Sequence, residues 1–199
     1  MTADTTSVLI VEDEPELAEL YATWLEDRFR VETAHDGTDA TEAIDETFDV
    51  VLLDRRIPGQ SGVDVLDAIR DRGLESRVAM VTAVEPDFDI VDMRFDDYLL
   101  KPVSRDELRN GIDRLLLRRA YDEQLQEFFT LASKKAMLVS QKSEAELQSS
   151  QEYAELEDRL AVLRVQVDET RTELLEQTSY RQLYQEIERV PTRPDESAN

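Results

Sequence analysis

Short apolar runs alternate with amphipathic segments between Ser7 and Leu117, and this alternation limits the possible folds more than any other feature of the chain. The runs are residues 8–11, 31–33, 50–53, 78–81 and 98–100. Short runs rich in Val, Ile and Leu are typical of strands in a parallel sheet that is covered on both faces. The alternation therefore predicts an α/β domain in which a strand–helix unit is repeated five times.

The segments between the runs carry helical signals. Residues 17–25 place apolar side chains three and one residues apart, which gives one apolar stripe on a helix. Residues 37–47 and 63–70 predict a second and a third helix. We expect the fourth helix to be short or irregular, because the connection after residue 82 contains Pro86 and three aspartates. Ser104 and Glu107 have the spacing of a capping box at the start of a fifth helix.

Beyond Leu117 the pattern becomes helical without strands. One face carries apolar residues at helical spacing (Tyr121, Leu125, Phe128, Ala132, Val139), and a later stretch follows heptad spacing (Tyr153, Leu156, Leu160, Leu163, Val167, Leu174) with Thr170 as its one polar gap. Residues 140–150 are expected to form the turn between two helices. Leu183, Tyr184 and Ile187 extend the apolar stripe, and residues 191–199 are expected to be disordered.

Three carboxylates follow predicted strands directly. Glu12 and Asp13 come after the first run, and Asp54 comes after the third. The carboxyl ends of parallel strands meet at one edge of a sheet, and a crevice opens there where the first and third strands are neighbours. Three carboxylates in one crevice repel each other unless a cation neutralises them, and an oxygen-rich pocket suits Mg²⁺. The sequence therefore predicts a magnesium site.

Two more strand ends complete the set. The fourth run is followed by Thr82, a hydroxyl donor, and the fifth by Lys101 and Pro102, which place a positive charge at a rigid exit from the strand. Neither residue is informative alone. The acidic pair, the Asp, the Thr and the Lys-Pro, in this order at successive strand ends, form a specific combination.

This combination resembles the receiver domains of two-component response regulators. The matching stretches are VLIVEDEP at 8–15, VLLDRRIPGQSGVDVL at 51–66, MVTA at 80–83 and DYLLKP at 97–102. The resemblance implies a flavodoxin-like (βα)5 fold, a doubly wound parallel sheet with strand order 2-1-3-4-5. It also implies a signalling protein that receives a phosphoryl group from a sensor histidine kinase, with Mg²⁺ as cofactor.

The resemblance assigns roles residue by residue. It makes Asp54 the phosphoryl acceptor and a metal ligand, with Asp13 binding Mg²⁺ directly, Glu12 acting through water and Arg56 offering its backbone carbonyl. Lys101 would pair with the phosphoryl oxygens, Thr82 would hydrogen-bond to them after phosphorylation, and Tyr98 would turn inward as Thr82 moves. Arg55 and Arg56, directly after the acceptor, depart from the family pattern and are expected to shield the phosphoryl group.

The charge balance of the chain indicates the kind of partner it can bind and the kind of organism it comes from. The chain has 46 acidic and 23 basic residues, a formal net charge of −23, and only four lysines (Lys101, Lys134, Lys135, Lys142). Acidic residues spread along the whole chain, together with few lysines, resemble the composition of haloarchaeal proteins, in which molar salt screens the repulsion between the negative charges. The chain has no cysteine, and residues 8–11 are too short for a signal peptide or membrane span. We expect a cytoplasmic protein with no membrane contact.

The tail resembles the HalX domain, a helical module found after haloarchaeal receiver domains, in the stretches FFTLASKKAMLVSQKSEAEL and EYAELEDRLAVLR. The expected division is a receiver domain at 7–118, a HalX-like helical hairpin or coiled coil at 119–190 and a disordered end at 191–199. The heptads fit a hairpin that packs on itself and a homodimer equally well.

Three classes of function compete. The preferred one is a response regulator whose tail acts through protein contacts. A transcription factor that binds DNA directly is the alternative, but residues 120–199 carry 17 acidic and 9 basic residues, and no basic helix face is visible. An aspartyl-phosphate hydrolase would usually carry a second acid where this chain has Arg56, so we do not expect an enzyme.

Overall fold

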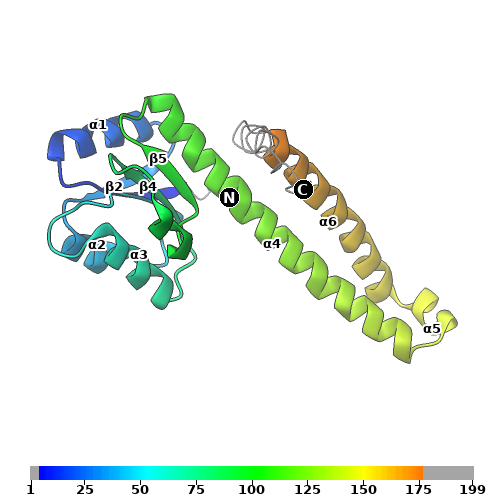
Figure 1. Ribbon diagram of the computed structural model, residues 1–199. Coiled ribbons are helices and arrows are strands. Elements are labelled where there is room, and N and C mark those ends of the chain that lie inside the picture. The colour runs from blue at the N-terminus through cyan, green and yellow to red at the C-terminus, as the bar shows by residue number, and fades with distance from the viewer. Residues whose placement is uncertain (1–4, 177–199) are drawn as a thin grey trace, which may run out of the picture. The chain divides into compact units, whose positions relative to one another are not determined.

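The computed structural model describes residues 5–176 and contains a five-stranded sheet followed by long helices (Figure 1). By its internal contacts the chain divides into one unit that ends at Leu116 and a second that begins at Leu117. The first unit contains the sheet. The second contains most of the helical tail, and each unit is described here by itself.

All five strands are parallel, in the order β2-β1-β3-β4-β5. They are β1 (Ser7–Val11), β2 (Arg30–Ala34), β3 (Val50–Leu53), β4 (Arg77–Thr82) and β5 (Asp97–Leu100). This order confirms the doubly wound fold, and each strand lies within a residue or two of its predicted position. β1 and β3 are neighbours, so the topological switch point at which a crevice is expected is present.

Helices cover both faces of the sheet (Figure 1). α2 (Gly37–Ala43) and α3 (Gly62–Asp71) pack on one face, and α1 (Pro15–Leu25) and the first turns of α4 (Arg105–Gln141) on the other. Successive residues of a strand point to opposite faces, so Leu9 and Val51 enter one core and Ile10 and Leu52 the other. This two-sided burial explains why the inner strands β1 and β3 are buried at every position, whereas the edge strand β2 carries Arg30 and Glu32.

The capping box at the start of the fifth predicted helix is confirmed. The Ser104 hydroxyl accepts from the Glu107 backbone N–H at 3.3 Å, and a Glu107 carboxylate oxygen accepts from the Ser104 N–H at 2.8 Å. The helix that begins here is α4, which continues to Gln141 across the boundary between the two units.

Two predicted helical segments differ from the structure, and a third is as expected. The fourth connection holds only a 3-10 segment, η1 (Phe88–Asp92), with no buried residue, which is the short, irregular helix that the sequence predicts. α2 ends at Ala43 instead of residue 47, because Ile44 turns into extended backbone and is buried in the core. The turn expected at 140–150 contains a short helix, α5 (Glu144–Ser149), which starts with a capping box of Ser143 and Glu146.

The second unit contains a hairpin in which α4 returns as α6 (Gln151–Glu176). Lys135 pairs with Glu157 at 2.8 Å, and the Thr170 hydroxyl donates to the Gln124 side chain at 2.9 Å. Thr170, the polar gap in the heptads, is thus buried with a hydrogen-bond partner. The stripe predicted at Leu183, Tyr184 and Ile187 and the disorder predicted at 191–199 lie outside the described residues.

Candidate functional site

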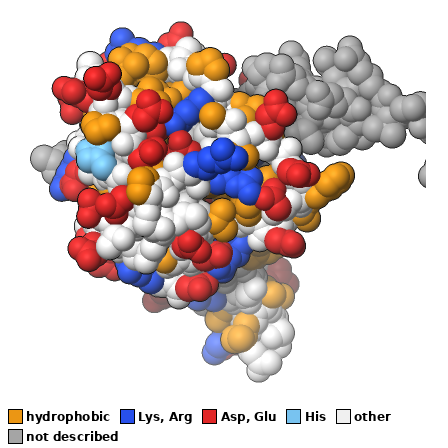
Figure 2. Space-filling model, turned by 60° about the vertical axis from the view of Figure 1, so that its left-hand side comes forward, with side chains coloured by type: hydrophobic (Ala, Val, Ile, Leu, Met, Phe, Trp, Pro, Cys, Tyr) orange, Lys and Arg blue, Asp and Glu red, His pale blue; other side chains and the backbone are white. Residues whose placement is uncertain are grey.

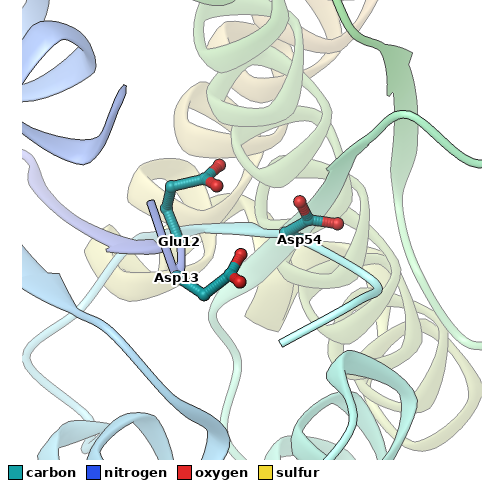
Figure 3. Close-up of side chains that lie close together, drawn as sticks. All are labelled: Glu12, Asp13 and Asp54. Atoms are coloured by element: carbon teal, nitrogen blue, oxygen red, sulfur yellow. The ribbon is translucent and has the colours of Figure 1, made fainter. Parts of the chain in front are cut away.

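The candidate site lies at the carboxyl edge of the sheet, where β1 and β3 end side by side. Glu12 and Asp13 follow β1 and Asp54 follows β3, and one carboxylate oxygen from each lies within 4.8 Å of the others. Figure 3 shows the three side chains close together. The structure therefore brings the three acids together as the sequence predicts.

Burial differs among the three acids. Glu12 is 2% exposed and Asp54 is 7% exposed, whereas Asp13 is exposed. Burial raises the pKa of Glu12 above its ordinary value, although the nearby Lys101 opposes this effect. The cluster therefore has a desolvated inner side, at Glu12 and Asp54, and a wet outer side, at Asp13.

Lys101 joins the two inner carboxylates. Its ammonium nitrogen lies 2.6 Å from Glu12 Oε2 and 2.6 Å from Asp54 Oδ2. Burial alone would lower the pKa of Lys101, but hydrogen bonds to Asp54 and Glu12 raise it, so the lysine stays charged. A single cation thus holds both acids, and three carboxylates against one ammonium leave two formal negative charges in the pocket.

The loop after Asp54 is held by its own backbone. Arg56 N–H donates to Asp54 Oδ1 at 3.0 Å, which fixes the Asp54 carboxylate, and Gly62 N–H donates to the Arg55 carbonyl at 3.1 Å. A Cβ at Gly62 would lie 2.1 Å from the Asp54 carbonyl oxygen, so only glycine allows this close approach. The metal role expected for the Arg56 carbonyl stays a prediction.

Thr82 and Tyr98 lie on β4 and β5 beside the site. Thr82 is 1% exposed, and its hydroxyl accepts from the Val84 N–H at 3.3 Å. The Tyr98 hydroxyl donates to the Val84 carbonyl at 2.7 Å, and its ring packs on Phe95 with centroids 5.4 Å apart. Both side chains therefore contact the same backbone segment, but the roles expected for them stay predictions.

Arg55 has a partner that the sequence did not indicate. Its guanidinium pairs with Asp89 of η1, and this bond raises the pKa of Arg55. The side chain is thus engaged with the 3-10 segment, while Arg56 is exposed. Asp89 was missed because it is one of three aspartates in an irregular segment with no periodic signal to distinguish it.

The structure also shows how the acidic side chains are distributed over the surface. Acidic side chains are spread over the visible face and not gathered in one block (Figure 2). Among residues 5–176, no helix has both the length and the apolar character needed to cross a bilayer.

Comparison with known proteins gives the same division of the chain. Residues 8–113 match the response regulator receiver domain, and residues 117–184 match the HalX domain. A predicted transcriptional regulator of Haloferax volcanii is 48% identical over 160 residues, covering 80% of this chain and 27% of its own length. The transcriptional regulatory protein CpxR of Escherichia coli is 37% identical over 123 residues, covering 60% of this chain and 53% of its own length.

Solved receiver domains have the same fold as the first unit. The receiver domain of a predicted LuxO repressor from Vibrio parahaemolyticus matches with a TM-score of 0.55 and 30% identity, covering 61% of this chain and 97% of that one. The BeF3-activated receiver domain of DrrB, a Thermotoga maritima protein, matches with a TM-score of 0.52 and 26% identity, covering 56% and 97%. The chain spans between about a quarter and a half of the length of the curated relatives described above.

Proposed function

This chain belongs to the response regulator receiver family and continues into a HalX domain, and on this basis we propose that Asp54 accepts a phosphoryl group from a sensor histidine kinase. The observation that carries the proposal is the buried Asp54 at the end of β3, between two further carboxylates and the ammonium of Lys101. The chain would act as a two-component signalling protein and not as an enzyme with a turnover of its own.

The donor set fits Mg²⁺. Hard carboxylate oxygens are the ligands that this ion prefers, and two uncompensated negative charges match a divalent cation. Asp13 would bind it directly from the wet side, Asp54 from the floor of the crevice, Arg56 through its carbonyl and Glu12 through water. When bound, Mg²⁺ would neutralise charge on the incoming phosphoryl group and on its anionic acceptor.

The chain's own residues would position and stabilise the phosphoryl group. A carboxylate oxygen of Asp54 would form the new P–O bond as the P–N bond to the kinase histidine breaks and the imidazole leaves with the electron pair. Lys101 already donates to Asp54 and would move its hydrogen bonds to the phosphoryl oxygens. The Thr82 hydroxyl, on the adjacent strand end, would donate to the same oxygens, and Tyr98 would follow it inward.

The output would pass to the helical tail. Lys101 lies four residues before Arg105, where α4 begins, and α4 continues without a break into the second unit. Repacking at Lys101 and Tyr98 thus reaches the start of an element that the tail shares. Direct binding to DNA is the alternative, and the relatives named as transcriptional regulators favour it. The acidity of the tail argues against it, and a gel-shift assay at several salt concentrations distinguishes the two.

A phosphorylation assay tests the proposal. The full chain is incubated with radiolabelled phosphoramidate, whose P–N bond imitates phosphohistidine, with Mg²⁺ or with a chelator. We expect Mg²⁺-dependent labelling of the wild type and of the control Asp92→Asn, which changes an aspartate outside the site. Asp54→Asn should take up no label. Equal labelling of Asp54→Asn and the wild type would contradict the assignment.

A further inference from the structure

The hairpin of α4 and α6 leaves one of its sides apolar. Two helices meet along a single seam, and in the described part of the second unit, 117–176, only Leu131, Leu163 and Thr170 are buried. Beside the seam runs a groove whose apolar lining comes from both helices (Phe128, Ala132, Ala136, Val139, Leu160, Ala161). Val139 is 51% exposed there. Such a face lowers its free energy by burial against another apolar surface.

The side of α6 that faces away from the groove has a different character. Residues at helical spacing there are mostly polar or charged (Glu155, Arg159, Gln166, Glu173), with Val162 as the apolar exception. On α4, the residues that line the groove recur at spacings of three and four and are apolar except for Lys135, and Leu125 continues the stripe toward the N-terminus of the hairpin. α6 is therefore amphipathic, and its groove side is suited to packing.

The charges in the groove are arranged for a second copy of the same chain. Glu157 and Arg164 lie one heptad apart on α6 and flank Leu160 and Ala161 symmetrically. Glu157 pairs with Lys135 within the hairpin, whereas Arg164 has no ion pair among residues 5–176. If two α6 helices pack antiparallel with the two-fold axis beside Leu160 and Ala161, Glu157 of each copy faces Arg164 of the other. An isologous interface needs this kind of self-complementarity.

Small side chains lie at the same level on both helices. The Lys135–Glu157 ion pair fixes the antiparallel register of the hairpin at 2.8 Å. Three residues before Lys135 on α4 is Ala132, and three residues after Glu157 on α6 is Leu160. Because the helices are antiparallel, Ala132 and Leu160 lie at the same level, and Ala161 follows Leu160. In such a dimer, the same two-fold axis would pass close to both Ala132 and Ala161. Their short side chains would allow the helices of the two copies to approach each other closely.

We propose that two copies of this chain dimerise through the groove of Phe128, Ala132, Ala136, Val139, Leu160 and Ala161 and form an antiparallel four-helix bundle in which Glu157 pairs with Arg164 across the two-fold axis. Helices joined by short connections in antiparallel pairs are the usual units of such bundles. The dimer goes beyond the proposed phosphorylation and does not depend on it, because the groove lies entirely within the second unit.

The test measures the mass of the full, unphosphorylated chain in molar KCl by light scattering and sedimentation over a range of concentrations. We expect a dimer for the wild type. Ala161→Glu puts a charge at the axis and should weaken the dimer roughly tenfold or more. Gln166→Glu adds the same charge on the far side of the same helix and should leave the mass unchanged. A monomeric wild type, or equal effects of the two variants, would overturn the proposal.

A mixing experiment tests the antiparallel pairing. Arg164→Glu alone places Glu opposite Glu, and Glu157→Arg alone places Arg opposite Arg, so each variant should dimerise more weakly than the wild type. Mixed together they restore both opposite-charge pairs, and we expect a heterodimer to form in preference to either homodimer. Circular dichroism checks that each variant keeps its helices. A mixture that associates no better than the separate variants would overturn the pairing of Glu157 with Arg164.

Discussion

Replacing Lys101 by Met should destabilise the first unit, because this ammonium is shared by two buried carboxylates. Its nitrogen is 2.6 Å from oxygens of both Glu12 and Asp54, and these side chains are 2% and 9% exposed. Breaking a buried ion pair by removing one partner costs about 3–5 kcal/mol. Here the pocket opens to water at Asp13 and Glu12 can take up a proton, so we expect a loss of about 2–3 kcal/mol in the free energy of unfolding at neutral pH.

The loss should depend on pH in a definite direction. Burial already raises the pKa of Glu12 above 4.5, and removing Lys101 removes the group that opposes this rise. The folded variant then binds more protons than the unfolded chain above about pH 4.5, so its stability falls as the pH rises through the raised pKa. The deficit relative to wild type should therefore be largest near neutral pH and smaller near pH 5.

Urea unfolding followed by the fluorescence of Trp24, the only tryptophan, measures this effect in the first unit. The experiment is run in molar KCl at about pH 7.5 and about pH 5, with a chelator. The control is Arg30→Met, which breaks an exposed pair with Glu32 and should change the stability by less than about 1 kcal/mol. A Lys101→Met variant as stable as wild type at neutral pH, or a deficit that grows toward acid, would refute the reasoning.

Three further results are expected. Asp13→Asn removes a ligand and a negative charge, so calorimetric titration should show Mg²⁺ affinity reduced about tenfold or more relative to the control Asp92→Asn; unchanged affinity would remove Asp13 from the site. The melting temperature should rise steeply with KCl from tenths molar to molar concentrations, and no dependence on KCl would remove the basis for a halophilic source. Asp89→Asn frees the guanidinium of Arg55 to approach the phosphoryl group, so the phosphorylated form should lose its phosphoryl group several-fold more slowly than the wild type. An unchanged rate of loss would contradict this, and so would a slower loss that persists when Asp89→Asn is combined with Arg55→Ala.

The sheet could be predicted because each of its strands is buried on both faces or lies beside one that is. Val50, Val51, Leu52 and Leu53 are all buried, and such a run has few interpretations other than an inner parallel strand. The acidic site followed from the same topology, since the ends of β1 and β3 must meet at one edge. Local sequence was therefore sufficient for the buried inner strands and for the acids at their ends.

The remaining features depend on contacts that sequence spacing does not encode. The pairing of Arg55 with Asp89 joins residues 34 positions apart across an irregular segment, and no periodicity points to it. The early end of α2 depends on Ile44 finding space in the core, which is a matter of tertiary packing. α5 was missed although its capping box is visible at Ser143 and Glu146, because a segment this short between two long helices was interpreted as a turn.

The most direct test of the central claim locates the phosphoryl group. The full chain is phosphorylated with a small acyl phosphate as donor and with Mg²⁺. The aspartyl phosphate formed on the protein is then reduced with borohydride, and the peptides are analysed by mass spectrometry. An aspartyl phosphate becomes homoserine under this treatment, so the account predicts homoserine at position 54 and at no other aspartate. Homoserine at position 13, or a stably phosphorylated chain with no homoserine at position 54, would contradict it.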